Sequence, residues 1–125
     1  MVDPSERYTA GMKVRREVLG DPYVDRSLKS ADELGRPLQE YVTEVAWGTV
    51  WSRPGLARKT RSLITVAMLA AINRPHELAI HVRGALRNGC TQEEIVEVML
   101  QAAVYAGAPA ALDGMRVARE VFAEA

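Results

Sequence analysis

The chain has 125 residues, of which 48% are apolar, 26% charged and 6% aromatic. This length fits one domain with one core, and the high apolar fraction excludes a disordered chain. Sixteen Lys and Arg residues balance sixteen Asp and Glu residues, so the formal net charge is zero. The polar start of the sequence is unlike a signal peptide, and the longest apolar run, Val66 to Ile72, is too short to cross a bilayer. We therefore expect one soluble, cytoplasmic domain over residues 1–125 with no membrane association.

The basic residues are concentrated in the middle of the chain. Residues 51–87 contain seven Lys and Arg residues and one acid, Glu77, a net charge of +6, whereas residues 1–50 and 88–125 carry −2 and −4. Thirteen of the sixteen basic residues are Arg, whose planar guanidinium forms paired hydrogen bonds with carboxylates. A biased composition with charges at helix ends would explain the same pattern. Because no aromatic residues alternate with these arginines, we expect a small anionic ligand and no nucleic acid.

Apolar periodicity predicts an all-α chain of about six helices and no sheet. The first helix is expected from about Pro4 to Leu19, with Asp3 as its N-cap, and Tyr23 to Ser30 is either a short helix or a loop. The next helix is expected from Pro37 to about Thr49, followed by a break at Arg53-Pro54-Gly55.

The second half of the chain is predicted to contain four helices. Residues 56–72 are apolar on nearly every side, which is typical of a central, mostly buried helix. Pro75 begins the next helix, Gly89 fits the position after its end, and Thr91 with Glu94 predicts a capping box. The inward residues of the last two helices are expected to be Ile95, Val98, Met99, Ala102 and Ala106, then Leu112, Met115, Ala118, Val121 and Phe122.

His81 is the first residue that could support chemistry. It is three residues after Leu78 and four before Ala85, so it is directed toward the apolar face of its predicted helix. Glu77, one turn earlier, could accept a hydrogen bond from the imidazole and favour its protonated form. A core histidine held by this carboxylate is the alternative to a catalytic one, and His76 is expected at the surface.

A second cluster surrounds the break at Arg53. Glu44 follows Tyr41 by three residues, near an apolar stripe, where a carboxylate needs a partner or a raised pKa. Trp47 and Trp51 are either core anchors or walls of a site. No phosphate loop, zinc motif, serine-hydrolase motif or Cys-x-x-Cys motif is present, and two histidines and one cysteine, Cys90, predict no disulfide and no metal site.

Six ordered blocks resemble the carboxymuconolactone decarboxylase family. They are Trp47-Gly48-x-x-Trp51-x-Arg53-Pro54-Gly55-Leu56, Arg61-Ser62-Leu63, Glu77-Leu78-x-x-His81, Ala85-Leu86-x-Asn88-Gly89, Glu93-Glu94-Ile95 and Tyr105-x-Gly107-x-Pro109-Ala110-Ala111. The peroxidase-linked disulfide reductases of this family carry Cys-x-x-Cys before the matching histidine. Here Arg74 and Glu77 occupy those positions, which excludes a thiol mechanism.

The resemblance implies an alkylhydroperoxidase D-like helical fold and ring-like homo-oligomers, hexamers or trimers. It implies decarboxylation of 4-carboxymuconolactone, a small dicarboxylate lactone, to the 3-oxoadipate enol-lactone of protocatechuate catabolism, without a cofactor. A relative acting on another acidic lactone and a non-catalytic oligomer that binds an aromatic acid are the alternatives.

Site roles follow as hypotheses from this reaction. His81 is the proton donor, with Glu77 or Glu44 orienting it. Substrate binding is expected from Arg53, Arg58, Arg61, Trp47, Trp51 and Tyr105.

Overall fold

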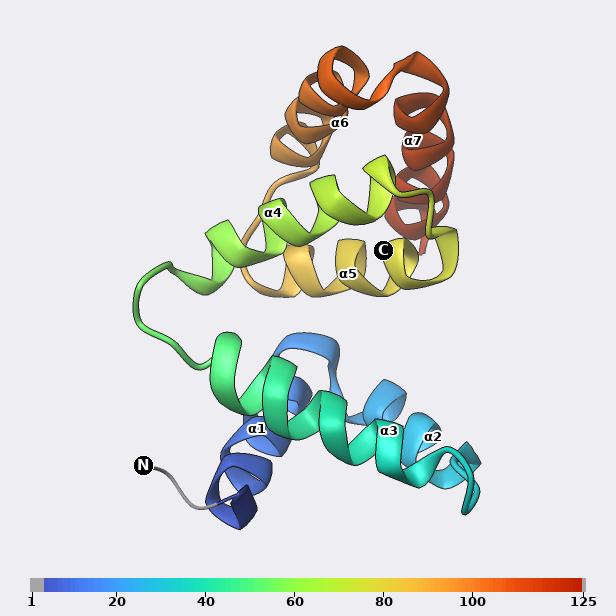
Figure 1. Ribbon diagram of the computed structural model, residues 1–125. Coiled ribbons are helices and arrows are strands. Elements are labelled where there is room, and N and C mark those ends of the chain that lie inside the picture. Colours follow the sequence, from blue (N-terminus) through green and yellow to red (C-terminus); the bar gives the residue numbers. More distant parts are fainter. Residues whose placement is uncertain (1–3, 125) are drawn as a thin grey trace. The chain divides into compact units, whose positions relative to one another are not determined.

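The computed structural model describes residues 4–124, and every regular element in them is helical (Figure 1). The described chain has seven α-helices and one π-helix, η1, so the expected all-α class is confirmed but the expected count of about six helices is too low. Their bounds are α1 Pro4–Leu19, α2 Asp21–Ser30, α3 Arg36–Tyr41, η1 Val42–Val50, α4 Arg58–Ala71, α5 Pro75–Arg87, α6 Gln92–Ala106 and α7 Ala108–Ala123. The chain forms two compact units, the first ending at Leu56 and the second starting at Ala57.

The N-terminal unit contains α1, α2, α3 and η1. The first helix has the expected bounds and buries Val14, Val18 and Leu19, whereas its expected N-cap, Asp3, lies outside the described residues. Tyr23 to Ser30, for which the sequence allows either a helix or a loop, is helical and belongs to α2. Pro22 occupies the first turn of this helix, where its missing N–H costs nothing, and Val24 is buried.

The helix expected from Pro37 to Thr49 changes its hydrogen-bond pattern after Tyr41. Residues Val42–Val50 form a π-helix, in which each bond spans five residues, as in the 2.8 Å bond from Trp51 N–H to the carbonyl oxygen of Ala46. The hydroxyl of Thr49 donates to the carbonyl oxygen of Glu44 over the same interval, at 3.1 Å. Side-chain periodicity predicts a helix here but does not reveal this bonding pattern.

Two glycines allow α1 to contact η1 backbone to backbone. A Cβ atom on Gly11 would lie 2.1 Å from the carbonyl oxygen of Thr43, and one on Gly48 would lie 2.2 Å from the carbonyl oxygen of Arg7. Beside this contact, the buried guanidinium of Arg15 donates to Thr43 Oγ1 at 3.1 Å, and that hydroxyl donates to the carbonyl oxygen of Gln39 at 2.8 Å. The close approach and this buried polar chain together fix α1 against the start of η1.

The C-terminal unit is a four-helix arrangement in which α4 packs against α5, α6 and α7 (Figure 1). Its core combines Val66 and Ala70 of α4 with residues of the other three helices and of the turn between α5 and α6: Leu78, Val82, Ala85, Cys90, Ile95, Met99, Ala118 and Val121. Most of the inward residues expected for these helices are confirmed. Leu112 and Ala106 are exceptions, because both are exposed.

The expectation that the central helix is buried on most sides is wrong for the described chain. In α4 only Ser62, Val66 and Ala70 are buried, whereas Ile64, Met68 and Ile72 are 38%, 61% and 57% exposed. The three exposed residues recur every four positions and form one apolar stripe. The neighbouring helices of its unit cover the opposite face of α4, which leaves this stripe uncovered.

The helix ends of the C-terminal unit follow the sequence signals. Gly89 has a φ of 92°, a left-handed value that favours glycine after a helix. The capping box is present, since Glu94 N–H donates to Thr91 Oγ1 at 3.0 Å and Thr91 N–H donates to Glu94 Oε1 at 2.9 Å. Arg83 binds the carboxylate of Glu124 through two hydrogen bonds of 2.9 and 2.8 Å, which ties the end of α7 to α5. No helix among residues 4–124 has the length and apolar character needed to span a membrane.

The contact of α1 with η1 predicts a strong effect of a single methyl group. Gly11→Ala and Gly48→Ala place that group against a backbone oxygen, so we expect each to lower the free energy of unfolding by about 2 kcal/mol or more in urea titrations. Gly55→Ala is the matched control, because nothing lies within 4 Å of its Cβ position, and it should stay within about 0.5 kcal/mol of wild type. Equal stability of all three variants would contradict the packing described here.

Candidate functional site

Arginines lie at the start of α4, where a helix does not favour them. The first turn of α4 holds Arg58, Lys59 and Arg61 and no acidic residue. Cations at a helix N-terminus oppose the helix dipole, so helix-end stabilisation does not explain their presence. Lys59 is accounted for by its ion pair with Glu94, with 3.0 Å between Nζ and Oε2. Arg58 and Arg61, both half-buried, remain the candidate anion-binding groups of the C-terminal unit.

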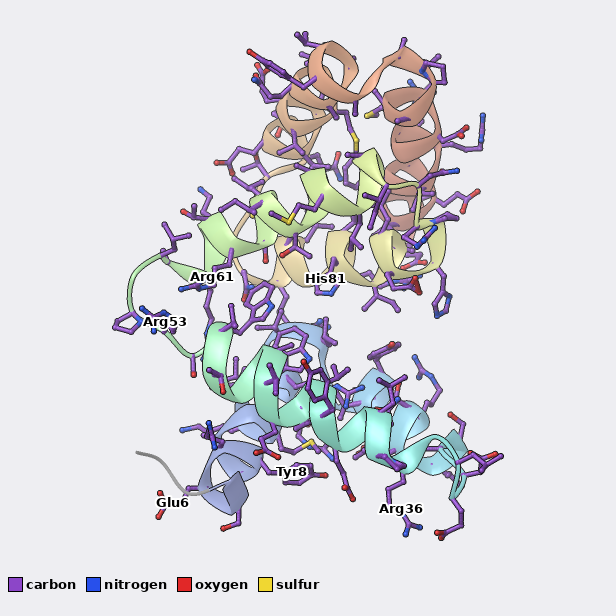
Figure 2. All side chains as sticks on the ribbon, viewed as in Figure 1. Glu6, Tyr8, Arg36, Arg53, Arg61 and His81 are labelled. Atoms are coloured by element: carbon purple, nitrogen blue, oxygen red, sulfur yellow. The ribbon has the colours of Figure 1, made fainter. Side chains whose placement is uncertain are left out.

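His81 projects from the middle of α5 and is half-buried. Its neighbours on the helix, Ile80 and Val82, are both buried, so the imidazole lies at the border of the core. Figure 2 shows the side chains of His81 and Arg61 extending from the same side of the pair formed by α4 and α5. A basic side chain and an imidazole are therefore presented together by the C-terminal unit.

The charge state of His81 differs from the sequence expectation. Burial lowers the pKa of His81 to about 4, so the imidazole is neutral at pH 7. The expectation that Glu77 favours the protonated form is wrong, because the Glu77 side chain is exposed and desolvation sets the direction of the shift. His76 is exposed, as expected.

The two tryptophans form one buried aromatic pair. The ring centroids of Trp47 and Trp51 are 4.9 Å apart and the ring planes meet at 27°, a stacked arrangement. Their exposed fractions are only 4% and 9%. The pair therefore serves as a rigid apolar element at the end of η1, in agreement with the interpretation of these residues as core anchors.

Glu44 lines a hollow on the N-terminal unit. The hollow has a volume of about 370 Å³ and is bounded by Ser5, Tyr8 and Thr9 of α1 and by Glu40 and Glu44. Glu44 is half-buried, and Glu40 precedes it by four residues. Tyr8 is labelled on α1 in Figure 2. This hollow is acidic, and none of the predicted arginines lines it.

Arg53 lines a different hollow of the same unit. This second hollow, of about 450 Å³, is bounded by Arg7 and Ala10 of α1 and by Gly48, Thr49, Ser52, Arg53 and Pro54. Its charged lining consists of the two arginines. Arg53 and Glu44 thus belong to separate depressions, which the sequence did not indicate.

The remaining predicted residues differ in exposure. Tyr105, at the end of α6, is 82% exposed. Cys90 is buried, and its Sγ lies 3.5 Å from the carbonyl oxygen of Lys59. Burial and the nearby carboxylate of Glu94 raise the pKa of the Cys90 thiol, which suits a packing residue and not a nucleophile. No group of three or more potential metal ligands lies together within the part of the chain that the structure describes.

Sequence reasoning missed two features of these regions. The sequence does not mark Arg7 as a binding residue, because an arginine on a polar helix resembles any surface residue. Its place in a hollow depends on the contact of α1 with η1. Asn88 Nδ2 donates to Ser62 Oγ at 2.9 Å, and Ser62 is fully buried. Asn88 and Ser62 both belong to the sequence blocks that resemble the family. Their presence in these blocks was the sequence signal for a structural link between the end of α5 and α4.

The described chain is thus all-helical, with arginines at the start of α4 and a half-buried imidazole on α5. The model of the carboxymuconolactone decarboxylase family matches residues 36–120, so the chain belongs to that family.

Curated relatives carry decarboxylase names. The chain is 45% identical over 121 residues to the 4-carboxymuconolactone decarboxylase of Acinetobacter baylyi, covering 97% of this chain and 90% of the relative. It is 48% identical over 113 residues to the nitrosuccinic acid decarboxylase npaB of Metarhizium robertsii, covering 90% and 79%. A 4-carboxymuconolactone decarboxylase sequence of Pseudomonas putida matches at 47% identity over 47 residues, which is 38% of this chain and 98% of that sequence.

The lowered pKa of His81 predicts a pH-dependent contribution to stability. An unfolded histidine titrates near pH 6.5 and the folded one near pH 4, so the unfolded state binds more protons between these values. His81 therefore reduces the free energy of unfolding as the pH falls from 6.5 to 4, and has no such effect above this range. In urea titrations between pH 6.5 and 4, the free energy of unfolding should fall more steeply with decreasing pH for wild type than for His81→Gln. Parallel curves, or an NMR midpoint for His81 near pH 6.5, would contradict the assignment.

Proposed function

We propose that the chain is a carboxy-lyase that converts 4-carboxymuconolactone to the 3-oxoadipate enol-lactone. The observation that carries this proposal is the 45% identity to the Acinetobacter baylyi enzyme over 97% of the chain. The neutral histidine and the arginine-rich segment supply the groups that the reaction requires.

The chemistry of this substrate determines what the protein has to provide. The substrate is an unsaturated lactone with two carboxylates. The bond from the ring carbon to one carboxylate breaks, CO₂ leaves, and the electron pair moves through the ring double bond to the lactone carbonyl. The resulting furanolate then takes one proton at carbon. Because the lactone itself accepts the electrons, the protein has to bind a dianion, stabilise the oxyanion and deliver a proton.

His81 is the residue that handles the proton in this proposal. Its imidazole is neutral in the free protein, since burial lowers its pKa to about 4. A bound dianion favours the imidazolium form, so His81 takes up a proton as the substrate arrives. It then donates this proton to the furanolate after CO₂ has left. The net uptake of one proton per turnover matches this order of events.

The arginines and the tryptophan pair serve binding. Arg58 and Arg61 are the anion-binding groups of the C-terminal unit, and Arg53 is that of the N-terminal unit. Each guanidinium offers the planar fork that a carboxylate accepts. The stacked rings of Trp47 and Trp51 supply a rigid apolar wall. Glu44, half-buried beside Tyr8, is the second acid–base group of the proposal.

The relative from Metarhizium robertsii supports a second candidate substrate. Nitrosuccinic acid is also a dicarboxylate, and its nitro group can accept the electron pair left by departing CO₂. The 48% identity over 90% of this chain is of the same order as that to the lactone decarboxylase. Both candidates require the same protein groups, so the choice of substrate depends on the shape of the site.

Copies of the chain associate, we propose, through α6 and α7. Leu100, Val104 and Leu112 are 58%, 75% and 66% exposed on these two helices. They adjoin or line a hollow of about 220 Å³ whose lining is entirely apolar: Val96, Met99, Leu100, Ala103, Ala108, Ala111, Leu112 and Met115. An exposed apolar surface of this kind marks an interaction site, and a second copy offers a matching surface. A cytoplasmic homo-oligomer of three or six chains is the proposed assembly.

Turnover of the lactone by purified protein tests the catalytic proposal. We expect ultraviolet absorbance to report loss of 4-carboxymuconolactone, and His81→Gln to reduce kcat by about 10²-fold or more while the circular dichroism spectrum is unchanged. His76→Gln, on the exposed side of the same helix, should retain wild-type turnover. Consumption of nitrosuccinate without loss of the lactone would assign the second candidate, and unchanged kcat in His81→Gln would refute the role of His81.

Light scattering after size-exclusion chromatography tests the assembly. We expect wild type to elute with the mass of a trimer or hexamer, and Leu112→Glu to shift it to a smaller species because a charge enters the apolar hollow. Gln101→Glu adds the same charge at an exposed position of α6 outside that lining and should leave the mass unchanged. A monomeric wild type would rule the proposal out.

A further inference from the structure

The hollow that contains Arg53 also contains a second arginine with no assigned role. Arg7 comes from α1 and Arg53 from the turn after η1, and both line the same depression of about 450 Å³. The close contact of Gly48 with the carbonyl oxygen of Arg7 explains why this turn of α1 is held at the end of η1. The two arginines, 46 positions apart in the sequence, are thus brought to one place by the packing of two helices.

Within the described part of the chain, no partner accounts for the charge of Arg7. Among residues 4–124, the structure contains no ion pair or side-chain hydrogen bond of Arg7, and its Nε atom is buried without an acceptor. Other arginines of this unit are paired: Arg16 with Asp21 and Asp25, and Arg36 with Glu33. A half-buried guanidinium that lacks a carboxylate has donors available for an anion from outside the chain.

The rest of the lining favours a carboxylate at this position. The described lining has no acidic side chain, and its remaining members are small or apolar residues together with two hydroxyl groups. Both hydroxyl protons are already donated, from Thr49 to the carbonyl oxygen of Glu44 at 3.1 Å and from Ser52 to that of Gly48 at 2.7 Å. The hydrogen-bond donors of this lining that remain for a ligand are therefore those of the Arg7 guanidinium, which suits a planar, doubly accepting anion.

We infer that the hollow formed by Arg7 and Arg53 is a carboxylate-binding site, with Arg7 as a binding residue. Its ligand is a small carboxylic acid, and the identification of that acid as the substrate rests on the proposed function. Arg7 therefore contributes to the affinity for this acid and not to a chemical step.

Binding of succinate, measured by isothermal titration calorimetry, tests the site without any turnover. We expect Arg7→Gln to weaken succinate binding about tenfold or more, and Arg7→Lys to bind with intermediate affinity because it keeps the charge but loses the fork. Arg26→Gln, an exposed position on α2, removes the same charge elsewhere in the unit and should bind as wild type does. If Arg7→Gln does not fold, Arg53→Gln replaces it, with the same expected loss.

Kinetics with 4-carboxymuconolactone extend the test to the substrate. Arg7→Gln should raise KM about tenfold or more and change kcat less than about threefold. Absence of turnover in wild type would overturn the proposed function alone, while the succinate result would still decide the site. Failure of wild type to bind succinate, or equal affinity of wild type and the Arg7 and Arg53 variants, would overturn the carboxylate site.

Discussion

The backbone contact of α1 with η1 is the constraint on which the N-terminal unit depends. Two helices approach this closely only where side chains are missing, and Gly11 and Gly48 meet that condition on the two partners. The contact brings Arg7 to the end of η1 and Arg15 to Thr43 at its start. A buried guanidinium without a carboxylate is costly, and burial lowers the pKa of Arg15 accordingly. The hydrogen bond from Arg15 to Thr43 Oγ1, which the same packing permits, offsets part of this cost.

In the C-terminal unit, the acidic third of the chain partly neutralises the basic middle. Glu94 pairs with Lys59 and Glu124 with Arg83, so both of these basic residues have structural roles. The desolvated position of His81 follows from its place on α5 between the buried residues Ile80 and Val82. The sequence suggested that a neighbouring carboxylate sets the charge of this histidine, whereas burial does so.

The helices of the C-terminal unit were predictable because their ends carry local signals. The capping box of Thr91 and Glu94 provides hydrogen-bond partners for backbone N–H groups within three residues of itself, and Gly89 allows the positive φ that follows the end of α5. The hollow of Arg7 and Arg53 was not predictable, since it results from a contact across more than thirty residues, and side-chain periodicity does not distinguish π-helical from α-helical bonding. The exposed stripe of α4 was mispredicted for a related reason: periodicity shows which residues are apolar but not how many neighbours exist to cover them. For the candidate site, the sequence supplied residue types as a hypothesis, whereas the neutral charge of His81 depends on a burial that the sequence did not reveal.

The π-helix has a consequence for how this segment tolerates insertions and deletions. A π-helical turn holds more residues than an α-helical turn, so η1 resembles an α-helix into which residues have been inserted. Removal of one residue from η1 would change the directions of the side chains near its end, because each residue of a helix turns the chain by a fixed angle. Trp47 and Trp51, which are stacked at 4.9 Å, lie at and just beyond the end of this segment. The number of residues in η1 therefore determines the direction of the side chains at its end. An insertion or deletion of a single residue would change these directions while leaving the amino-acid composition almost the same.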